Sequence, residues 1–341
     1  MKYDVTIGIP IYNSVSCIRT SLMSALSQSY HSIEFILVND CCTDGTFDVV
    51  EYVLSSNERC DDVRIFTHTQ NQGVSASRNQ IIDEARGEYL YFMDSDDIIA
   101  KNTIELLMQN ARRYDAEVVF GSYKKIETSG KKTIYQYPCI QLLEKNKLAS
   151  FAYRKYDGIQ ASACNYIVKT NILRVNNHRF INVNYWEDLV FTFDLVTFVS
   201  RAVLLPDITY IYRCRDNSLS HYQERINISK AEVMGNVEAI AHLKSTSVLL
   251  YDKVYFPSRC YNIVMTDFYI ACAILKRRKT IIPYITNNEI KAIMSHPASW
   301  HQICSFHNSC FKNQLLYILG KTPSSMCVFI IKCLGKLKKL I

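Results

Sequence analysis

The sequence predicts an α/β fold in which helices cover both faces of a mainly parallel sheet. Between residues 5 and 120, short β-rich segments alternate with segments whose apolar residues recur at helical spacing. One β-rich segment, Phe35-Ile36-Leu37-Val38, is apolar throughout, which is typical of a parallel strand buried on both sides. Strands that alternate with helices in this way form parallel sheets with crossover helices.

The elements are expected in a regular order along the chain. Pro10 ends the first strand, and Gly87 stops the third helix. After residue 120 the sequence mixes strand and loop, and from about residue 225 it has helical periodicity. We therefore expect a sheet domain over residues 1–222 and a helical C-terminal region over residues 223–341. The predicted strands are 5–9, 35–38, 63–66, 89–93 and 118–120, and the predicted helices are 17–28, 47–54, 74–85 and 104–114.

The composition is that of a globular protein. Of the 341 residues 48% are apolar and 21% are charged, which excludes a disordered chain and a collagen-like fibre. No run of about 18 apolar residues appears and the N-terminus lacks an apolar signal segment, so neither a membrane-spanning helix nor a secretory signal is expected. Thirteen cysteines without a CxxC pair indicate reduced thiols in a cytosolic protein rather than disulfides or a zinc ribbon.

The positive charge of the chain lies at its C-terminal end. The formal net charge is +7, the last acidic residue is Glu289, and seven lysines without an arginine follow it. Those lysines equal the whole excess, so the preceding residues are neutral in sum. A neutral body with a basic tail favours contact between the C-terminus and an acidic surface.

The end of the tail has the pattern of an amphipathic helix, with Lys332, Lys336 and Lys339 on the face opposite to the apolar residues. Such a helix suits an anionic membrane surface, although a terminal helix packed on the body with its lysines in solvent would give the same pattern. Nucleic acid is less favoured, because the basic residues are not interleaved with arginine or glycine. The apolar residues are Met326, Phe329, Ile330, Cys333, Leu334, Leu337 and Leu340.

Polar residues follow the first four predicted strands. Because ligands of such sheets bind beyond the carboxyl ends of the strands, we expect these residues to converge on a binding site at one rim. The chain lacks both GxGxxG and GxxxxGK[ST], which argues against a Rossmann dehydrogenase and a P-loop NTPase. The rim residues are Pro10, Tyr12 and Asn13, then Asn39 and Asp40, then Asn71, Gly73, Ser75, Arg78 and Asn79, and finally Asp94, Ser95, Asp96 and Asp97.

The segment Asp94-Ser95-Asp96-Asp97 places three carboxylates within four residues. They cannot all ionise cheaply without a cation, and hard oxygen ligands at the end of a sheet suit Mg²⁺ or Mn²⁺. Such an ion takes one or two protein carboxylates and completes its shell with phosphates and water. An acidic turn that caps the next helix would leave the same sequence, because aspartate is common in turns and caps.

Five blocks in a fixed order resemble the family 2 glycosyltransferases. They cover about residues 3–220, and the chain beyond about residue 225 lies outside the resemblance. The resemblance implies a GT-A fold and transfer of a sugar with inversion at the anomeric carbon. The chain departs from the family at Asn39-Asp40-Cys41-Cys42, where members commonly carry Asp-Asp-Gly-Ser. The blocks are Ile7–Asn13, Leu37–Asp40 with Thr43–Thr46, Asn71–Asn79, Gly87–Asp97 and Trp186–Asp188.

The resemblance implies a nucleotide site at the rim. Asp40 would bind the base, and Asp94 would lie near the ribose. Asp96 would bind Mn²⁺ or Mg²⁺, which bridges the diphosphate of the donor. Pro10 and Tyr12 would line a uracil pocket. The other nucleotide-binding residues are expected to be Asn13, Arg78 and Ser95.

Catalytic residues are expected in the Trp186-Glu187-Asp188 block. The resemblance implies that Asp188 is the general base with Glu187 beside it, although two acids that begin an apolar helical stretch are also favoured there by the helix dipole. Trp186 is expected near the acceptor because it adjoins the base. The basic segment Arg213–His221 follows a predicted strand and could close over the diphosphate, and His221 is a second candidate for the metal site.

The sequence therefore predicts an inverting, metal-dependent glycosyltransferase that moves a hexosyl or N-acetylhexosaminyl group from a UDP-sugar to a glycan or lipid-linked acceptor in surface polysaccharide assembly. It is expected to be cytoplasmic and peripheral on the cytoplasmic face of the membrane. Two alternatives remain. A sugar-phosphate nucleotidylyltransferase should show a glycine- and arginine-rich loop where this chain has Pro10–Asn13. A non-catalytic scaffold of glycan assembly would not need the carboxylates that are kept here.

Overall fold

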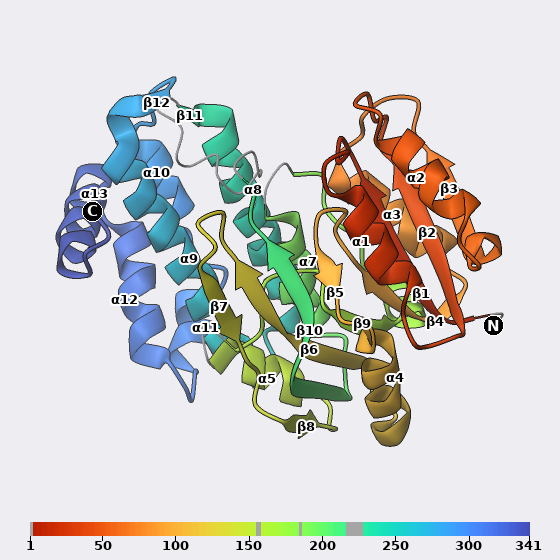
Figure 1. Ribbon diagram of the computed structural model, residues 1–341. Coiled ribbons are helices and arrows are strands. Elements are labelled where there is room, and N and C mark those ends of the chain that lie inside the picture. The colour runs from red at the N-terminus through yellow and green to blue at the C-terminus, as the bar shows by residue number, and fades with distance from the viewer. Residues whose placement is uncertain (1–2, 155–157, 184–185, 216–227) are drawn as a thin grey trace. The chain divides into compact units, whose positions relative to one another are not determined.

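In the computed structural model, ten strands form one mixed sheet within the residues that the structure describes (Figure 1). The structure describes residues 3–154, 158–183, 186–215 and 228–341. Contacts divide the chain into two units, the first of residues 1–148, 161–182 and 191–217 and the second of residues 149–160, 183–190 and 218–341. The predicted boundary between residues 222 and 223 lies outside the described residues and stays a prediction.

The sheet belongs to the first unit and contains two parallel parts. In spatial order its strands are β3 (Val63–Thr67), β2 (Ile33–Asn39), β1 (Tyr3–Ile11), β4 (Gly87–Phe92), β9 (Tyr166–Lys169), β6 (Val118–Ile126), β10 (Ala202–Arg213) and β5 (Ile98–Ile99), with β7 (Lys132–Tyr135) on β6 and β8 (Ile140–Leu142) on β10. β3, β2, β1 and β4 pair in parallel, as predicted, and β6 pairs in parallel with β10. β9 joins the two parts and runs antiparallel to both neighbours.

β1 is longer than predicted, because it continues through Pro10 to Ile11. A proline offers no N–H to the sheet, so it is tolerated only where no partner strand needs that N–H. The carbonyl of Gly8 accepts a hydrogen bond from Met93 N at 3.1 Å, which shows that Gly8 faces β4. Pro10 faces the same side two residues later, beyond Phe92, the last residue of β4. No ladder hydrogen bond is therefore lost.

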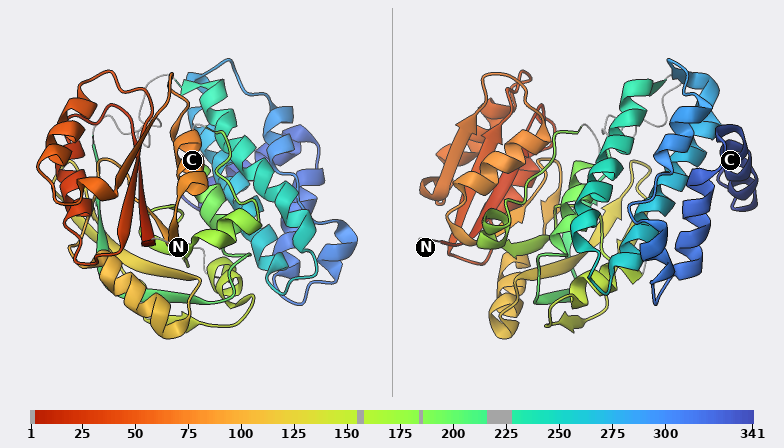
Figure 2. Two further views of the ribbon diagram at one scale, coloured as in Figure 1. Left: turned by 90° about the vertical axis from the view of Figure 1, so that its right-hand side faces the viewer. Right: turned by 180° about the vertical axis from the view of Figure 1, so that it is seen from behind.

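Helices cover both faces of the sheet, as predicted. α1 (Ile18–Leu26) and α2 (Thr46–Ser55) pack against each other, and α3 (Val74–Glu84) packs against β1 and β2. The chain reverses its direction across the sheet after β3, so a right-handed crossover places α3 on the face opposite to α1 and α2 (Figure 2). The other elements of this part are η1 (Cys60–Asp62), α4 (Thr103–Tyr114) and α6 (Thr170–Val175), while α5 (Lys147–Arg154) and α7 (Glu187–Leu195) each cross a division between the units.

The second unit is mainly helical, as predicted for the C-terminal region. Its elements are α8 (Lys230–Ser247), η3 (Val248–Leu250), α9 (Phe256–Arg277), η4 (Arg278–Thr280), α10 (Asn287–Ile293), α11 (Trp300–Cys304), α12 (Cys310–Lys321) and α13 (Ser324–Leu337), with a parallel pair of β11 (Ile228–Ser229) and β12 (Ile281–Ile282). α9 contacts α8, α10, α12 and α13. Its fully buried Arg259 donates to Ser247 Oγ at 2.8 Å, to Tyr153 OH at 2.6 Å and to Thr246 Oγ1 at 3.0 Å, so this buried charge has polar partners.

α13 confirms the predicted C-terminal helix but packs with a face that the apolar pattern did not indicate. Its buried residues are Cys327, Val328, Ile331 and Gly335, whereas Met326, Phe329, Cys333, Leu334 and Leu337 of the predicted apolar face are exposed. Gly335 explains this choice, because a Cβ there would lie 3.0 Å from Cys272 Sγ of α9. In the described part of the chain, no helix is both long and apolar enough to span a membrane.

Replacement of Gly8 by alanine should destabilise the first unit. The added Cβ would lie 2.2 Å from Cγ2 of Ile81 in α3, and overpacking of this kind costs about 1–3 kcal/mol. The midpoint of thermal unfolding should therefore fall. Gly235→Ala in α8 is the control, because its Cβ meets nothing within 4 Å and alanine is favoured over glycine in a helix by about 1 kcal/mol. An unchanged midpoint for Gly8→Ala would show that α3 can move away from β1 without cost.

Candidate active site

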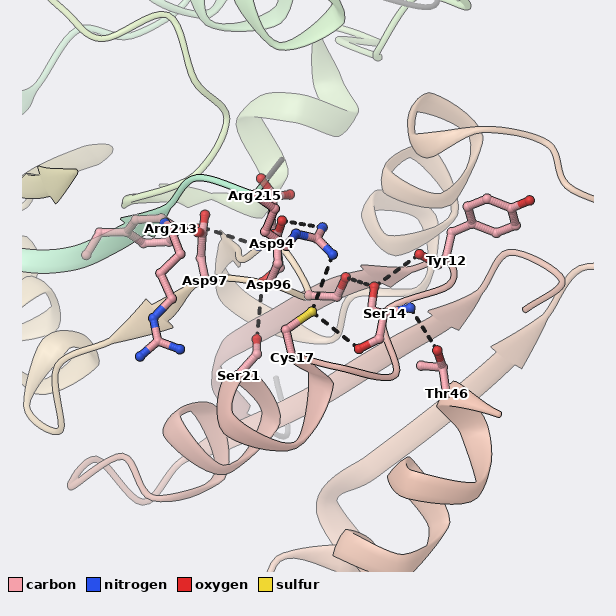
Figure 3. A network of polar contacts seen from close by, with 12 residues as sticks. Tyr12, Ser14, Cys17, Ser21, Thr46, Asp94, Asp96, Asp97, Arg213 and Arg215 are labelled. Carbon is pink, nitrogen blue, oxygen red and sulfur yellow. Dashed lines mark hydrogen bonds and ion pairs between the residues drawn. The ribbon is translucent and has the colours of Figure 1, made fainter. Parts of the chain in front are cut away.

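The loops that follow β1, β2 and β4 meet at Ser14. Its backbone N–H donates to Thr46 Oγ1 at 2.8 Å, and its hydroxyl lies 2.7 Å from Ser95 Oγ (Figure 3). Ser14, Thr46 and Ser95 are all buried, so these contacts are shielded from water. The structure thus brings together three of the strand ends that the sequence predicted to converge.

Asn13 fixes the turn that leaves β1. Its backbone is left-handed, with a φ of 43°, and its side-chain oxygen accepts a hydrogen bond from Thr43 N at 2.9 Å. Asparagine adopts this conformation more readily than most residues. Tyr12 is 49% exposed, so its ring is open to a ligand, whereas Pro10 is buried within β1. Contact of Tyr12 and Pro10 with a base remains an expectation.

Asp40 is buried and holds the loop that begins α3. Its two carboxylate oxygens accept hydrogen bonds from Gln72 N at 2.7 Å and from Gly73 N at 2.8 Å. His68 Nδ1 lies 2.7 Å from the same carboxylate, and His68 Nε2 lies 2.9 Å from Gln80 Oε1. A carboxylate offers about four acceptor positions, and the contacts with Gln72, Gly73 and His68 fill three of them. Sequence reasoning missed His68 and Gln80, although the place of His68 directly after β3 was an available signal.

Arg78 reaches from α3 to the first of the clustered carboxylates. Its Nη2 lies 2.8 Å from Asp94 Oδ1, and its guanidinium carbon lies 5.2 Å from the centre of the Phe180 ring. The Arg78 side chain is 4% exposed, while 34% of the Asp94 side chain remains accessible. The backbone N–H of Asp94 donates to Tyr210 OH at 3.3 Å. Asp94 is therefore held firmly and can still accept a hydrogen bond from a ligand hydroxyl.

Asp97 is buried and binds the end of β10 to the loop after β4. Its Oδ2 accepts a hydrogen bond from Tyr210 OH at 2.7 Å, and its Oδ1 accepts one from Arg213 N at 2.8 Å. Burial, reinforced by Asp94 and Asp96, raises the pKa of Asp97 to about 8. Both oxygens of Asp97 accept hydrogen bonds from β10, so this carboxyl is held against that strand.

Asp96 forms an ion pair with Arg215, whose guanidinium also donates to Cys17 Sγ at 3.5 Å (Figure 3). The Asp96 side chain is 18% exposed. Burial and the neighbouring Asp94 raise the pKa of Asp96, and Arg215 opposes this rise. Because the pKa stays raised beside Arg215, a further positive charge at Asp96 would stabilise the ionised carboxylate.

A divalent cation would find oxygen ligands at Asp96 but not a complete protein site. Among the described residues, no group of three or more His, Cys, Asp or Glu side chains is arranged to hold a metal ion. Mg²⁺ and Mn²⁺ need few protein carboxylates when a diphosphate supplies the other oxygens. The hard oxygens of Asp96 and the raised pKa that it keeps beside Arg215 therefore fit the predicted metal role. His221, the second predicted ligand, lies outside the described residues.

Trp186, Glu187 and Asp188 lie at the N-terminal end of α7 and are half-buried. The carbonyl of Trp186 accepts a hydrogen bond from Val190 N at 3.0 Å, and Asp188 Oδ1 accepts one from Leu189 N at 2.8 Å. A helix N-terminus favours an ionised carboxylate, which is the form that a base requires. These residues belong to the second unit, and their roles as base and acceptor contact stay predictions.

Comparison with known protein families identifies the domain that contains the rim residues. Residues 6–170 match the model described as glycosyl transferase family 2. These residues form a family 2 glycosyltransferase domain. The chain accordingly contains a glycosyltransferase domain, as the sequence predicted. The family 2 domain contains the rim residues from Pro10 to Asp97, and the Trp186–Asp188 block lies beyond it.

Curated relatives of the family 2 domain are also glycosyltransferases. The glycosyltransferase GlyG of Streptococcus pneumoniae serotype 4 is 28% identical over 224 residues, which are 64% of this chain and 73% of GlyG. A cholesterol galactosyltransferase of Borreliella burgdorferi is 23% identical over 253 residues, which are 70% of this chain and 69% of that relative.

Solved structures confirm the predicted GT-A class of fold. S. aureus TarS 1–349 in complex with UDP-GlcNAc has a TM-score of 0.63 at 17% identity, over 93% of this chain and 89% of that chain. The mannosyltransferase PcManGT from Pyrobaculum calidifontis, in complex with GDP-Man and Mn²⁺, has a TM-score of 0.54 at 15% identity, over 99% of this chain and 88% of that chain. At these identities the likeness establishes the fold alone.

Asp40→Asn should destabilise the first unit even without nucleotide. An asparagine has a single side-chain oxygen, so the N–H of Gln72 or of Gly73 would lose its acceptor at a cost of about 1–3 kcal/mol. The midpoint of thermal unfolding without ligand should fall. Asp207→Asn, at an exposed position of β10, is the control. If nucleotide binding were lost at an unchanged midpoint, Asp40 would serve the ligand alone.

Proposed function

We propose that the chain transfers a hexosyl or N-acetylhexosaminyl group from a UDP-sugar to an acceptor hydroxyl, with inversion at the anomeric carbon and with a divalent metal. The observation that carries this proposal is the carboxylate cluster of the family 2 domain, in which Arg78 holds Asp94 and Asp96 keeps a raised pKa. TarS, solved with UDP-GlcNAc, and PcManGT, solved with GDP-Man and Mn²⁺, support a nucleotide-sugar donor and the use of a metal.

Three side chains of the rim are the nucleoside contacts that we propose. The exposed ring of Tyr12 offers a face to uracil, and the remaining acceptor position of Asp40 suits an N–H of that base. Asp94 would accept hydrogen bonds from the ribose hydroxyls. Asn13 and Ser95 would act through the loops that they hold, which carry these contacts.

Asp96 is the metal ligand that we propose, with oxygens of the diphosphate and water in the other positions. When bound, Mn²⁺ or Mg²⁺ would neutralise charge that develops on the departing diphosphate. Arg215 already lies beside Asp96, so its guanidinium can turn toward phosphate oxygens once the donor is present. His221 is a further candidate for the same site.

Asp188 is the general base that we propose, with Glu187 as its neighbour. Its carboxylate would take the proton of the acceptor hydroxyl while that oxygen bonds to the anomeric carbon and the bond from that carbon to the diphosphate breaks. The N-terminal end of α7 favours the ionised form that this step needs. Trp186 would contact the acceptor sugar. A single displacement inverts the anomeric configuration.

The acceptor that we propose is a glycan or a lipid-linked saccharide in surface polysaccharide assembly, at the cytoplasmic face of a membrane. The support for this place is the basic end of the chain, in which seven lysines follow the last acidic residue. We propose that the basic amphipathic tail of the C-terminal region, residues 223–341, contacts the membrane surface.

Asp96→Asn should remove the metal dependence of nucleotide binding. Titration calorimetry with UDP, GDP and dTDP, each with and without Mn²⁺, should show metal-dependent binding of UDP to the wild-type protein. Asp207→Asn should behave as the wild type, because its side chain is exposed in β10. If the wild-type protein binds UDP equally tightly with and without Mn²⁺, the metal role of Asp96 is contradicted. If no diphosphate binds, the scaffold alternative is favoured.

Asp188→Asn should lower turnover by about 10²- to 10⁴-fold, the usual contribution of a general base. Binding of the donor nucleotide should be unchanged, because the proposed base acts on the acceptor. Release of UDP from UDP-sugars in the presence of acceptor measures the turnover. Glu187→Gln is the matched neighbour and should have a smaller effect. Unimpaired turnover of Asp188→Asn would remove this residue from the base role.

A further inference from the structure

We propose that a pocket between α10 and the C-terminal end of α12 binds a phosphate group of an anionic membrane lipid, and that exposed apolar stripes of α12 and α13 contact the same bilayer. The pocket and both stripes belong to the second unit. This inference rests on the proposed function in one respect, which is that the surface bound by the pocket and the stripes is a membrane.

The pocket has a volume of about 390 Å³ and is lined by two lysines and by no carboxylate. Lys291 comes from α10, and Lys321 is the last residue of α12. In the described part of this unit, the salt bridges to carboxylates use other lysines, Lys230, Lys244 and Lys253. Lys321 Nζ lies 5.4 Å from the centre of the ring of Tyr317, which is uncharged, so the charge of both pocket lysines is available to an anion.

The nearby titratable groups do not cancel this charge. His296 accepts a hydrogen bond from Ala298 N at Nδ1, at 3.0 Å, and its Nε2 lies 3.0 Å from Asn313 Oδ1. Burial lowers the pKa of His296, so its ring is a neutral wall of the pocket. Glu289 is bonded to Lys230, and this bond together with its helix-cap bonds lowers the pKa of Glu289 to about 2. That carboxylate already has a cation as its partner.

α12 and α13 expose large apolar side chains at helical spacing. On α12, Phe311, Leu315 and Ile318 follow one another at four and three residues and are 69%, 53% and 49% exposed. On α13, Phe329 and Leu337 are 66% and 80% exposed. Apolar stripes of this kind beside lysines are the pattern of helices that lie in the interface of a membrane.

An anionic bilayer fits this surface better than a second copy of the chain does. Residues 290–341 contain seven lysines and no acidic residue. Two copies that met through this same surface would bring like charges together, which opposes association. A bilayer of anionic lipid supplies the opposite charge for the lysines and an apolar interior for the stripes.

Sedimentation of the full-length chain with vesicles tests this inference. The wild-type protein should sediment with vesicles of phosphatidylcholine and phosphatidylglycerol and not with vesicles of phosphatidylcholine alone. Lys291→Gln combined with Lys321→Gln should weaken partitioning by about 25-fold, because one lysine near an anionic surface contributes about fivefold. The control is Lys131→Gln with Lys132→Gln, which removes the same charge from exposed positions of the first unit.

A second variant tests the stripes separately. Phe329→Ser combined with Leu337→Ser leaves every charge in place and should also weaken partitioning into the mixed vesicles. Unchanged partitioning of this variant would remove the stripes from the contact. Circular dichroism melting of all variants identifies any that fail to fold.

Three outcomes would overturn the inference. If the pocket variant partitions like its control, the pocket has no role beyond net charge. If inorganic phosphate binds the pocket tightly in calorimetry and vesicles do not compete, the site takes a small soluble anion. If light scattering shows a dimer that does not sediment with vesicles, the stripes serve a second copy. Binding of UDP and Mn²⁺ is measured on the same proteins, and its absence in a wild type that binds vesicles would contradict the proposed function alone.

Discussion

The rim depends on how the fold accommodates three carboxyl groups within four residues. Asp94 is met by Arg78 from α3, Asp97 by the end of β10, and Asp96 by Arg215, which follows β10. Repulsion between neighbouring carboxylates would otherwise oppose folding, so α3 and β10 must both reach the end of β4. In this arrangement the pKa of Asp96 stays raised, so a bound cation would stabilise its ionised carboxylate.

Much of the first half of the fold could be predicted from local pattern, because buried parallel strands must be apolar on both faces and crossover helices must be amphipathic. β2 and α1 are examples. Pairing over long distances could not be predicted in the same way. β9 inserts antiparallel between β4 and β6, and a strand of four residues carries no sign of its direction. The ion pair between Asp96 and Arg215 could not be predicted, because it joins segments far apart in the sequence. The helix that begins at Glu187 could be predicted from its pattern, but the groups that its side chains contact could not.

In the candidate site, too, some features could be predicted from the sequence and others could not. The convergence of the loops around Ser14 follows from the rule that parallel strands end at one rim, so position alone predicted it. The hydrogen bonds of His68 depend on side-chain direction, which no spacing reveals. On α13, the packed face was decided by the small residue Gly335 and its approach to α9, and hydrophobic periodicity gives a glycine no weight.

The segment of residues 93–97 between β4 and β5 is short for the distance that it covers. β9, β6 and β10 lie between those two strands, so in a flat sheet β4 and β5 would be roughly 19 Å apart. The segment could reach roughly 20 Å only if it were fully extended, yet Asp97 N donates to Asp94 O at 3.2 Å in a turn. The sheet must curl for this link to close. Because this link is short and turned, it confines Asp94, Asp96 and Asp97 to the place where the sheet curls.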